Sequence, residues 1–373
     1  MEGFKSLTRE DQIRQKLRDL YASYGYGRYR QGKFEPYDMY RENINFLKND
    51  MVITFTDSTG KLMALKPDVT MSIVKSIPPD AGSVKLFYIE NVFRMTPGSG
   101  EFREISQIGL ESVGEADCCR LAEVITLAAK TLETIDSDHI ICVSHMGLVS
   151  AVFEACGFDR GMSARAACAL SGRNRSQLLS AAKEAALSPE SAGLLETIVS
   201  VRSRAGDAAR ALRALRFNAA ASAAADEIEA LCDAVSNVID TERIIIDFTQ
   251  VNDFDYYTGV TFRGYVNGLP RAVLSGGGYD KLMRKFGKPQ SAVGFALYLG
   301  ELPRLFSEKD EYDADILLIY SDAPARLVTN AAESLIKSGK TVRVEKTPPL
   351  GVRTRQVLRL SADGSVSEVS ADD

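Results

Sequence analysis

The sequence has few of the residues that usually build metal sites. Only two histidines occur, His139 and His145, and none of the six cysteines stands in a C-x-x-C pair. Zinc sites are usually marked by closely spaced cysteines and histidines. The sequence therefore predicts no metal site, and the cysteines are expected to be reduced thiols of a cytoplasmic protein.

Two further absences narrow the class of protein. The first residues, MEGFKSLTREDQIRQK, lack the apolar core of a signal peptide, and no apolar run is long enough to cross a bilayer. The chain carries a formal net charge of -5 with a pI near 5.4. Because proteins that bind nucleic acid usually present a basic face to the phosphates, we expect neither nucleic acid nor membrane among the partners.

Glycine-rich phosphate loops are also missing. The segment GGGYDK at 276–281 does not have the glycine spacing of a dinucleotide-binding or phosphate-binding loop. Its glycines are instead predicted to allow a tight turn or a close approach of two backbones. No cofactor is expected.

Hydrophobic spacing predicts the elements of the first half of the chain. Thr8 and Asp11 form a capping box that begins a helix, and this helix ends near Gly25. Strand-like runs follow at 51–57, 62–68, 85–94 and 103–114, and the PGSG turn between the last two predicts an antiparallel hairpin. Residues 116–135 then return to helical spacing.

The second half begins with a change in composition. Residues 158–240 are rich in alanine and leucine and predict a helical insertion. Strand patterns resume at 243–250, 255–266 and 271–280, whereas 292–306 is typical of a buried helix. The tail contains one strand–helix–strand unit at 314–345, predicted to offer at most two parallel strands and one helix, followed by a polar, frayed end.

Strands on both sides of a helical insertion indicate an α+β fold built on a largely antiparallel sheet. The predicted core is discontinuous and comprises residues 1–157 and 241–310. The helical insertion occupies 158–240, and a truncated α/β segment occupies 311–373.

Four ordered segments resemble the histidyl type of class II aminoacyl-tRNA synthetases. FYIENVFRMTPGSGEFREISQIGLESVG (87–114) resembles motif 2, and LMALKPDVT (62–70) resembles the segment that precedes it. DFDYYTGVTFRGY (253–265) resembles the histidyl-specific LDYYTGTVFE segment, and SGGGYDKLMRKFGKPQSAVGFALYLGEL (275–302) resembles the stretch that ends in motif 3. The resemblance covers roughly residues 5–306 and implies a class II synthetase-like sheet with flanking helices.

Several positions that serve ATP in those synthetases have changed. The motif 2 arginine is present as Arg94, but the acidic residue two positions later is Thr96. The histidyl-specific arginine aligns with Asn252, and the arginine and glycine of motif 3 align with Glu301 and Tyr298. A cationic phosphate clamp can contribute about 10³–10⁵ in the rate of phosphoryl transfer. We therefore expect no catalytic residues and no aminoacylation activity.

The amino-acid side of the resembling site has kept its polar residues. By resemblance, one group surrounds the α-amino group of a bound histidine, and a second group faces its imidazole. Each residue also has a plain structural explanation, such as packing in the core or an ion pair. The first group is Asp68, Thr70 and Gln107, the second is Glu111, Tyr256 and Tyr257, and the pocket further includes Arg94, Gly277 and Tyr279.

The lost arginines favour a regulatory role. The chain resembles the regulatory subunits of ATP phosphoribosyltransferase, which implies support of the first step of histidine biosynthesis and feedback control by histidine. The resemblance further implies a homodimer, a complex with the short-form catalytic subunit and L-histidine as ligand. The proline of motif 1 aligns with Gly32, although FEP at 34–36 follows intact.

Two other functions stay open on the sequence alone. The chain could be an active histidyl-tRNA synthetase or another amino-acid-adenylating paralogue, because Arg94 and the pocket residues are retained. It could also be a free-standing histidine sensor in a different assembly. The tail argues against tRNA recognition, because 314–345 resembles only the beginning of the anticodon-binding domain.

Overall fold

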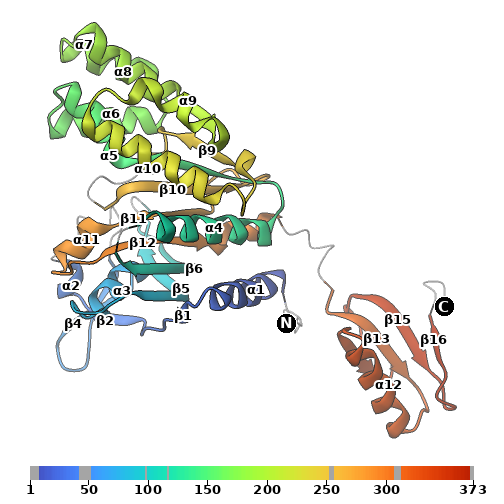
Figure 1. Ribbon diagram of the computed structural model, residues 1–373. Coiled ribbons are helices and arrows are strands. Elements are labelled where there is room, and N and C mark those ends of the chain that lie inside the picture. The colour runs from blue at the N-terminus through green and yellow to red at the C-terminus, as the bar shows by residue number, and fades with distance from the viewer. Residues whose placement is uncertain are drawn as a thin grey trace. The chain divides into compact units, whose positions relative to one another are not determined.

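The computed structural model describes residues 8–41, 52–96, 99–115, 117–251, 256–305 and 312–369 (Figure 1). The chain forms two compact units, Arg14–Leu302 and a second unit that contains Pro303–Asp373 together with Met1–Ile13. Asn252, which the sequence aligns with a synthetase arginine, lies outside the described residues.

A nine-stranded sheet forms the centre of the larger unit (Figure 1). Its strand order is β1-β5-β6-β12-β11-β10-β7-β9-β8, and the described pairs are antiparallel except for β1 with β5 and β7 with β9. This arrangement confirms the predicted α+β fold. The strands are β1 (Gly27–Arg28), β5 (Val84–Met95), β6 (Phe102–Gly114), β7 (His139–His145), β8 (Arg202–Arg204), β9 (Ile244–Asp247), β10 (Thr258–Val266), β11 (Leu274–Gly278) and β12 (Ser291–Tyr298).

Helices α1 (Arg9–Ser23) and α4 (Cys118–Ile135) contribute to the core on one face of this sheet. The Tyr21 ring of α1 lies 5.9 Å from the ring of Phe87 and 6.2 Å from that of Phe295. Its hydroxyl forms a 2.8 Å hydrogen bond with Thr131 of α4. The side chains on this face are apolar, so the polar residues that the sequence singles out point to the opposite face, here called the site face.

The predicted hairpin is confirmed. Strands β5 and β6 pair antiparallel from Val84 opposite Val113 to Met95 opposite Phe102. The helix predicted at 116–135 is also present as α4. In contrast, the strand predicted at 62–68 ends earlier, because β4 (Leu62–Leu65) is followed by α3 (Val69–Ser76), a helix that the sequence did not predict.

The buried helix predicted at 292–306 is wrong. Residues 291–298 form β12, and only the following η5 (Leu299–Leu305) is a short 3-10 helix. β12 lies between β6 and β11, and most of its residues are buried. A strand covered on both faces lacks the alternation of apolar and polar residues, so its sequence cannot be distinguished from that of a buried helix.

The segment predicted as a helical insertion, 158–240, contains five α-helices and one short strand. The edge strand β8 lies within it and pairs with β9. Its residues, Arg-Ser-Arg, carry no apolar strand signal, and charged residues are common on edge strands. The helices that surround it are α6 (Arg160–Ser171), α7 (Arg175–Glu184), α8 (Pro189–Ser200), α9 (Ala208–Leu212) and α10 (Ala219–Val235), after α5 (Met146–Ala155).

The C-terminal unit is more complete than predicted. Its sheet has the order β14-β13-β15-β16, and β13 (Ala314–Tyr320) pairs parallel with both β14 (Val342–Glu345) and β15 (Thr354–Leu360). β16 (Val366–Glu368) adds an antiparallel edge, and α12 (Ala325–Lys337) packs on one face. The limit of two parallel strands is therefore wrong, because TRQVLRL, in the segment predicted to be a polar, frayed end, forms the third parallel strand, β15.

The described residues contain neither a membrane-spanning helix nor a cluster suited to a metal ion, and their cysteines form no disulfides. No described helix is both long and apolar enough to span a membrane. No described cluster of three or more His, Cys, Asp or Glu side chains could hold a metal ion. All six cysteines lie in the described ranges and carry free thiols. Localisation in the cytoplasm stays a prediction.

The glycines of β11 allow neighbouring strands and side chains to pack closely against its backbone, and a substitution at Gly276 tests this packing. A Cβ at Gly276 would lie 2.4 Å from the carbonyl oxygen of Gly294 and 2.5 Å from Cζ of Phe262. We expect Gly276→Ala to lower the free energy of unfolding by about 1–3 kcal/mol in urea denaturation. Gly193→Ala is the control, because no described atom outside α8 would lie within 4 Å of the new Cβ.

This control variant should be more stable than the wild type by up to about 1 kcal/mol, because alanine favours a helix interior. Equal unfolding free energies for the two variants would contradict the packing described for β11.

Candidate functional site

One row of residues crosses the site face of the large sheet. Glu111 on β6 lies opposite Gly294 on β12, Gly294 lies opposite Gly277 on β11, and Gly277 lies opposite Thr261 on β10. A Cβ at Gly294 would lie only 1.8 Å from Oε2 of Glu111. The glycine is therefore needed to leave room for the Glu111 carboxylate.

Glu111 is the central group of this site. It is only 2% exposed, and its Oε1 accepts a 2.6 Å hydrogen bond from the Thr70 hydroxyl. Its Oε2 is buried and has no hydrogen-bond partner among the described residues. Burial raises the pKa of the Glu111 carboxyl to about 8, although the hydroxyls of Thr70 and Tyr279 partly lower it. The Tyr279 hydroxyl is near the carboxylate but does not meet hydrogen-bond geometry.

Three tyrosines lie beside this carboxylate. The ring centroids of Tyr256 and Tyr257 are 4.7 Å apart, and those of Tyr256 and Tyr279 are 6.3 Å apart. A Cβ at Gly277 would lie 2.8 Å from Cδ1 of Tyr257, so this ring lies directly on the glycine. Burial raises the pKa of all three phenols, which therefore stay neutral.

The remaining predicted residues lie at the edge of this group. Asp68 caps α3 by accepting a 2.8 Å hydrogen bond from the Met71 amide, and its Oδ2 is 3.8 Å from Nη2 of Arg94. Arg94 also donates a 2.8 Å bond to the Pro67 carbonyl. Gln107 is buried on β6 and shares the side of the strand that carries Glu111. The fold thus assembles all nine predicted residues in one region.

Two further tyrosines belong to this region but were not predicted as pocket residues. Tyr88 is fully buried opposite Gly109, and burial followed by the charges of Glu111 and Asp68 raises its pKa. Tyr298, noted in the sequence only as a replaced glycine, is the last residue of β12 and lies opposite Gln107. Tyr88 could have been found from strand alternation across the hairpin, whereas the position of Tyr298 depended on recognising β12 as a strand.

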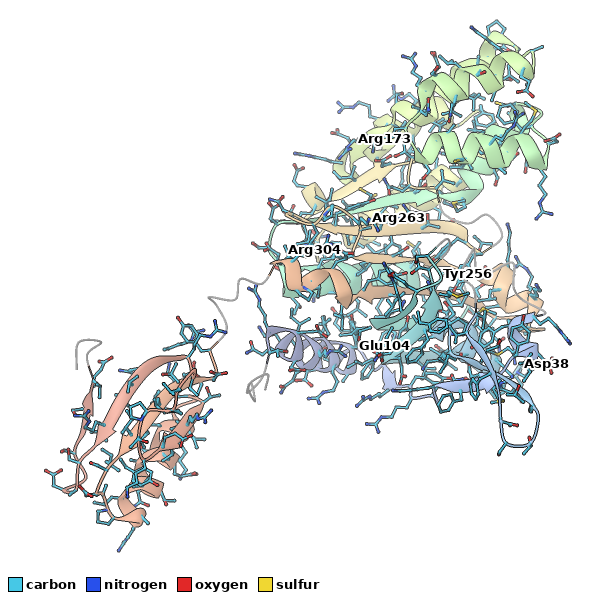
Figure 2. All side chains as sticks on the ribbon, turned by 180° about the vertical axis from the view of Figure 1, so that it is seen from behind. Asp38, Glu104, Arg173, Tyr256, Arg263 and Arg304 are labelled. Carbon is cyan, nitrogen blue, oxygen red and sulfur yellow. The ribbon has the colours of Figure 1, made fainter. Side chains whose placement is uncertain are left out.

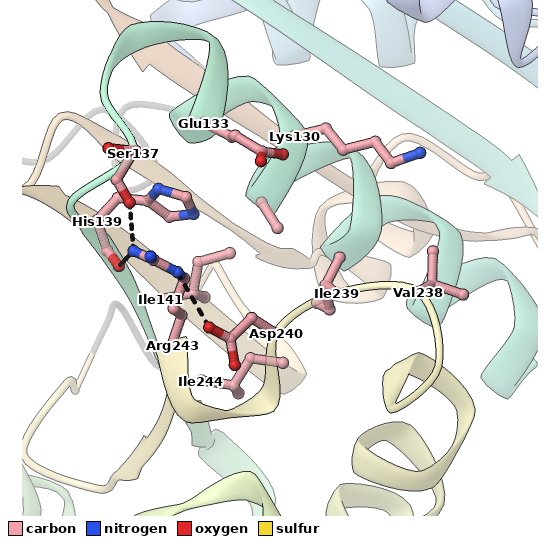
Figure 3. A pocket seen from close by; sticks show the side chains of 11 residues that line it. Lys130, Glu133, Ser137, His139, Ile141, Val238, Ile239, Asp240, Arg243 and Ile244 are labelled. Carbon is pink, nitrogen blue, oxygen red and sulfur yellow. Dashed lines mark hydrogen bonds and ion pairs between the residues drawn. The ribbon is translucent and has the colours of Figure 1, made fainter.

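A small cavity of about 160 Å³ lies away from these residues, where α4 and β7 meet the turn before β9 (Figure 3). Arg243 in its wall donates to the backbone carbonyls of Ser137 and His139 and forms a 3.3 Å ion pair with Asp240. His139 donates through Nδ1 to the Asp136 carbonyl at 2.9 Å. These groups hold the turn in place, so we assign them a structural role.

Comparison with known proteins identifies the family. A family model described as histidyl-tRNA synthetase matches residues 5–302. A curated ATP phosphoribosyltransferase regulatory subunit from Anaeromyxobacter dehalogenans is 30% identical, over 77% of this chain and 84% of its own length. The chain belongs to the ATP phosphoribosyltransferase regulatory subunit family. The prediction of a non-catalytic regulatory subunit in histidine biosynthesis, rather than a synthetase, is confirmed by this membership.

Solved structures show the same fold as this regulatory subunit. An ATP phosphoribosyltransferase regulatory subunit/histidyl-tRNA synthetase from Bacillus halodurans has a TM-score of 0.77 at 22% identity and covers 97% of this chain and 98% of its own. A chain of the ATP phosphoribosyl transferase (HisG:HisZ) complex from Thermotoga maritima has a TM-score of 0.62 at 16% identity and covers 78% and 98%. At these identities the likeness confirms the class II synthetase-like fold.

The raised pKa of Glu111 predicts a pH dependence of stability. The unfolded carboxyl ionises near 4.5, whereas the folded one keeps its proton until about pH 8. The stability linked to this proton is fully present below 4.5 and is lost as the pH rises to 8, at roughly 1.4 kcal/mol per unit. Glu111→Gln cannot ionise, so its melting temperature relative to wild type should rise between about pH 5 and about pH 8. A constant difference across this range would contradict the assignment.

Proposed function

We propose that this regulatory subunit binds L-histidine at Glu111 and acts with a short-form catalytic subunit of ATP phosphoribosyltransferase. Its family membership supports the regulatory role. The Thermotoga maritima complex, whose name pairs HisG with HisZ, supports the partnership.

The observation that carries the histidine proposal is the unsatisfied Oε2 of Glu111. Leaving a buried polar group unsatisfied costs about 1–3 kcal/mol. An imidazole offers an N–H donor at the end of a flat ring, and it would supply the missing hydrogen bond. The neutral tyrosine rings around Glu111 provide aromatic walls for such a ring.

The charges at the edge of the site suit the other end of an amino acid. Asp68 is about one fifth exposed and offers a carboxylate to the α-amino group. Arg94 lies beside it, is held by the Pro67 carbonyl, and offers a guanidinium to the α-carboxylate. Gln107 adds an amide on the same face of the sheet. A zwitterionic ligand with an imidazole side chain therefore matches both ends of the site.

The lack of aminoacylation activity follows from the residue that replaces a phosphate-binding arginine of the resembling synthetases. Glu301 in η5 brings a carboxylate to the position where the resembling synthetases have a phosphate-binding arginine. Like charges repel, so this change opposes the triphosphate rather than stabilising its transition state. Feedback control then requires that histidine binds one state of the complex more tightly than the other, with reciprocal coupling between histidine and the partner.

Mixing the chain with a short-form catalytic subunit tests this function. We expect co-elution in size exclusion and inhibition by histidine of phosphoribosyl transfer from phosphoribosyl pyrophosphate to ATP. Glu111→Gln should keep co-elution but, at a pH above about 8 where the wild-type carboxylate is ionised, weaken histidine affinity about tenfold or more in calorimetry, because a charged hydrogen bond contributes about 1.5–3 kcal/mol. The control is Glu190→Gln, at an exposed site on α8. Failure to co-elute, or equal affinities for both variants, would reject the proposal.

We further propose that the chain forms a homodimer through its small sheet. β4 lies between β2 (Phe34–Pro36) and β3 (Thr54–Thr56). Phe34 is 61% exposed and packs edge-on against Phe55, with ring centroids 5.4 Å apart. Met63 and Leu65 lie between them in register. This apolar face follows the FEP segment that resembles motif 1, through which the resembling synthetases dimerise.

The neighbouring Glu35 points the other way. It is buried and accepts a 2.9 Å hydrogen bond from Ser72, which fixes β2 so that Phe34 faces outward. Phe34→Asp should therefore convert the dimer to a monomer in sedimentation analysis without unfolding it. Phe102→Asp, which changes an even more exposed phenylalanine on β6, should remain dimeric. A monomeric wild type, or a dimeric Phe34→Asp variant, would overturn the dimer proposal.

A further inference from the structure

A group of charged side chains lies where the helical insertion meets the large sheet. Arg173, which Figure 2 labels, comes from the turn between α6 and α7 and forms an ion pair with Asp247 at the end of β9. Asp247 is only 1% exposed, and its second oxygen accepts a 3.0 Å hydrogen bond from the Thr249 amide. Both oxygens of this carboxylate are therefore satisfied by the protein itself.

Two further arginines lie on the same face of the sheet. Arg202 on β8 is the register partner of Asp247. Arg263 on β10 is the register partner of Cys142 on β7, and Cys142 pairs with Ile245, two residues before Asp247. Because residues two apart on a strand share a face, Arg202, Arg263 and Asp247 all point to the site face.

The charged side chains lie close enough to the Cys142 thiol to affect its pKa. The pKa of the Cys142 thiol is raised to about 11, chiefly by burial and also by the charge of Asp247, while Arg202, Arg173 and Arg263 act to lower it. The thiol is therefore neutral, and three guanidinium groups and one carboxylate act on it. Within the described ranges, Arg202 forms no ion pair. Arg263 donates to the Val251 carbonyl at 3.4 Å and interacts with the Tyr265 hydroxyl.

Two buried hydroxyls extend this face toward the histidine site. Ser144 on β7 lies opposite Thr261 on β10, two residues along from Cys142 and Arg263. Both side chains are fully buried, and neither hydroxyl has a hydrogen-bond partner among the described residues. Buried hydroxyls are nearly always bonded, so an oxygen-rich ligand at this position would explain both of them.

We propose that this junction binds the diphosphate group of a phosphorylated ligand. Arg202 and Arg263 stand on strands separated by β9 and β7, so their backbones are about 14 Å apart across the sheet. Their long side chains can converge from this separation on an anion of two linked phosphates, and guanidinium groups suit such bidentate contacts. Ser144 and Thr261 supply the neutral donors.

The site would lie next to the proposed histidine pocket. Thr261 follows Gly277 in the row that begins at Glu111, and the Tyr257 ring lies on Gly277 between them. A ligand at the arginines would therefore contact the ring that walls the histidine pocket. Because Arg202 belongs to the insertion and Arg263 to β10 of the sheet, the same ligand would also join these two parts.

Calorimetric titration of the full chain with inorganic pyrophosphate tests the proposal. Arg202→Gln should weaken binding about tenfold or more, because it removes a charged donor. Arg210→Gln is the matched control, since it removes the same charge from an exposed site in the insertion. Parallel titrations with ATP and phosphoribosyl pyrophosphate identify which source of diphosphate binds most tightly.

A second variant separates binding from folding. Thr261→Val removes an unsatisfied hydroxyl without changing the shape of the side chain, so it should raise the melting temperature of the free protein and weaken pyrophosphate binding. Absence of pyrophosphate binding to the wild type, or equal losses in Arg202→Gln and Arg210→Gln, would overturn the site. Binding in Thr261→Val as tight as in the wild type would exclude the hydroxyl from it.

Discussion

A carboxylate buried against bare backbone is the constraint around which the candidate site is organised. Glu111 occupies space that exists only because Gly294 on the next strand has no side chain. One oxygen is bonded to Thr70, and the other has no partner among the described residues. Burying such a group stabilises nothing by itself. Its presence is therefore better explained by a ligand than by the fold.

The surroundings of Glu111 show how a synthetase-like scaffold can serve regulation. Fold and function are separable, because function depends on particular side chains. Here the polar residues that resemble an amino-acid pocket lie together, whereas Glu301 aligns with a phosphate-binding arginine of the resembling synthetases. A protein that holds an amino acid but does not activate it is suited to report on the concentration of that amino acid.

The site face also connects parts of the chain that are distant in sequence. A row of register partners runs from Glu111 through Gly294, Gly277 and Thr261 to Ser144. The small side chains along this row leave space above the sheet, and the Tyr257 ring fills the part of that space above Gly277. One aromatic side chain therefore lies between the proposed histidine and diphosphate sites, so that ligands at the two positions can influence each other.

The fold class and the hairpin of β5 and β6 could be predicted from the sequence, because ordered segments and alternation are local signals, and the nine pocket residues stay a prediction from resemblance. The sequence could not determine that 291–298 is a strand, since a run buried on both faces has no periodicity. Nor could it reveal β8, whose Arg202 lies opposite the buried Asp247 of β9. Register between distant strands is a tertiary property, and it decided that Gly294 makes room for Glu111 and that Arg202 lies opposite the buried Asp247.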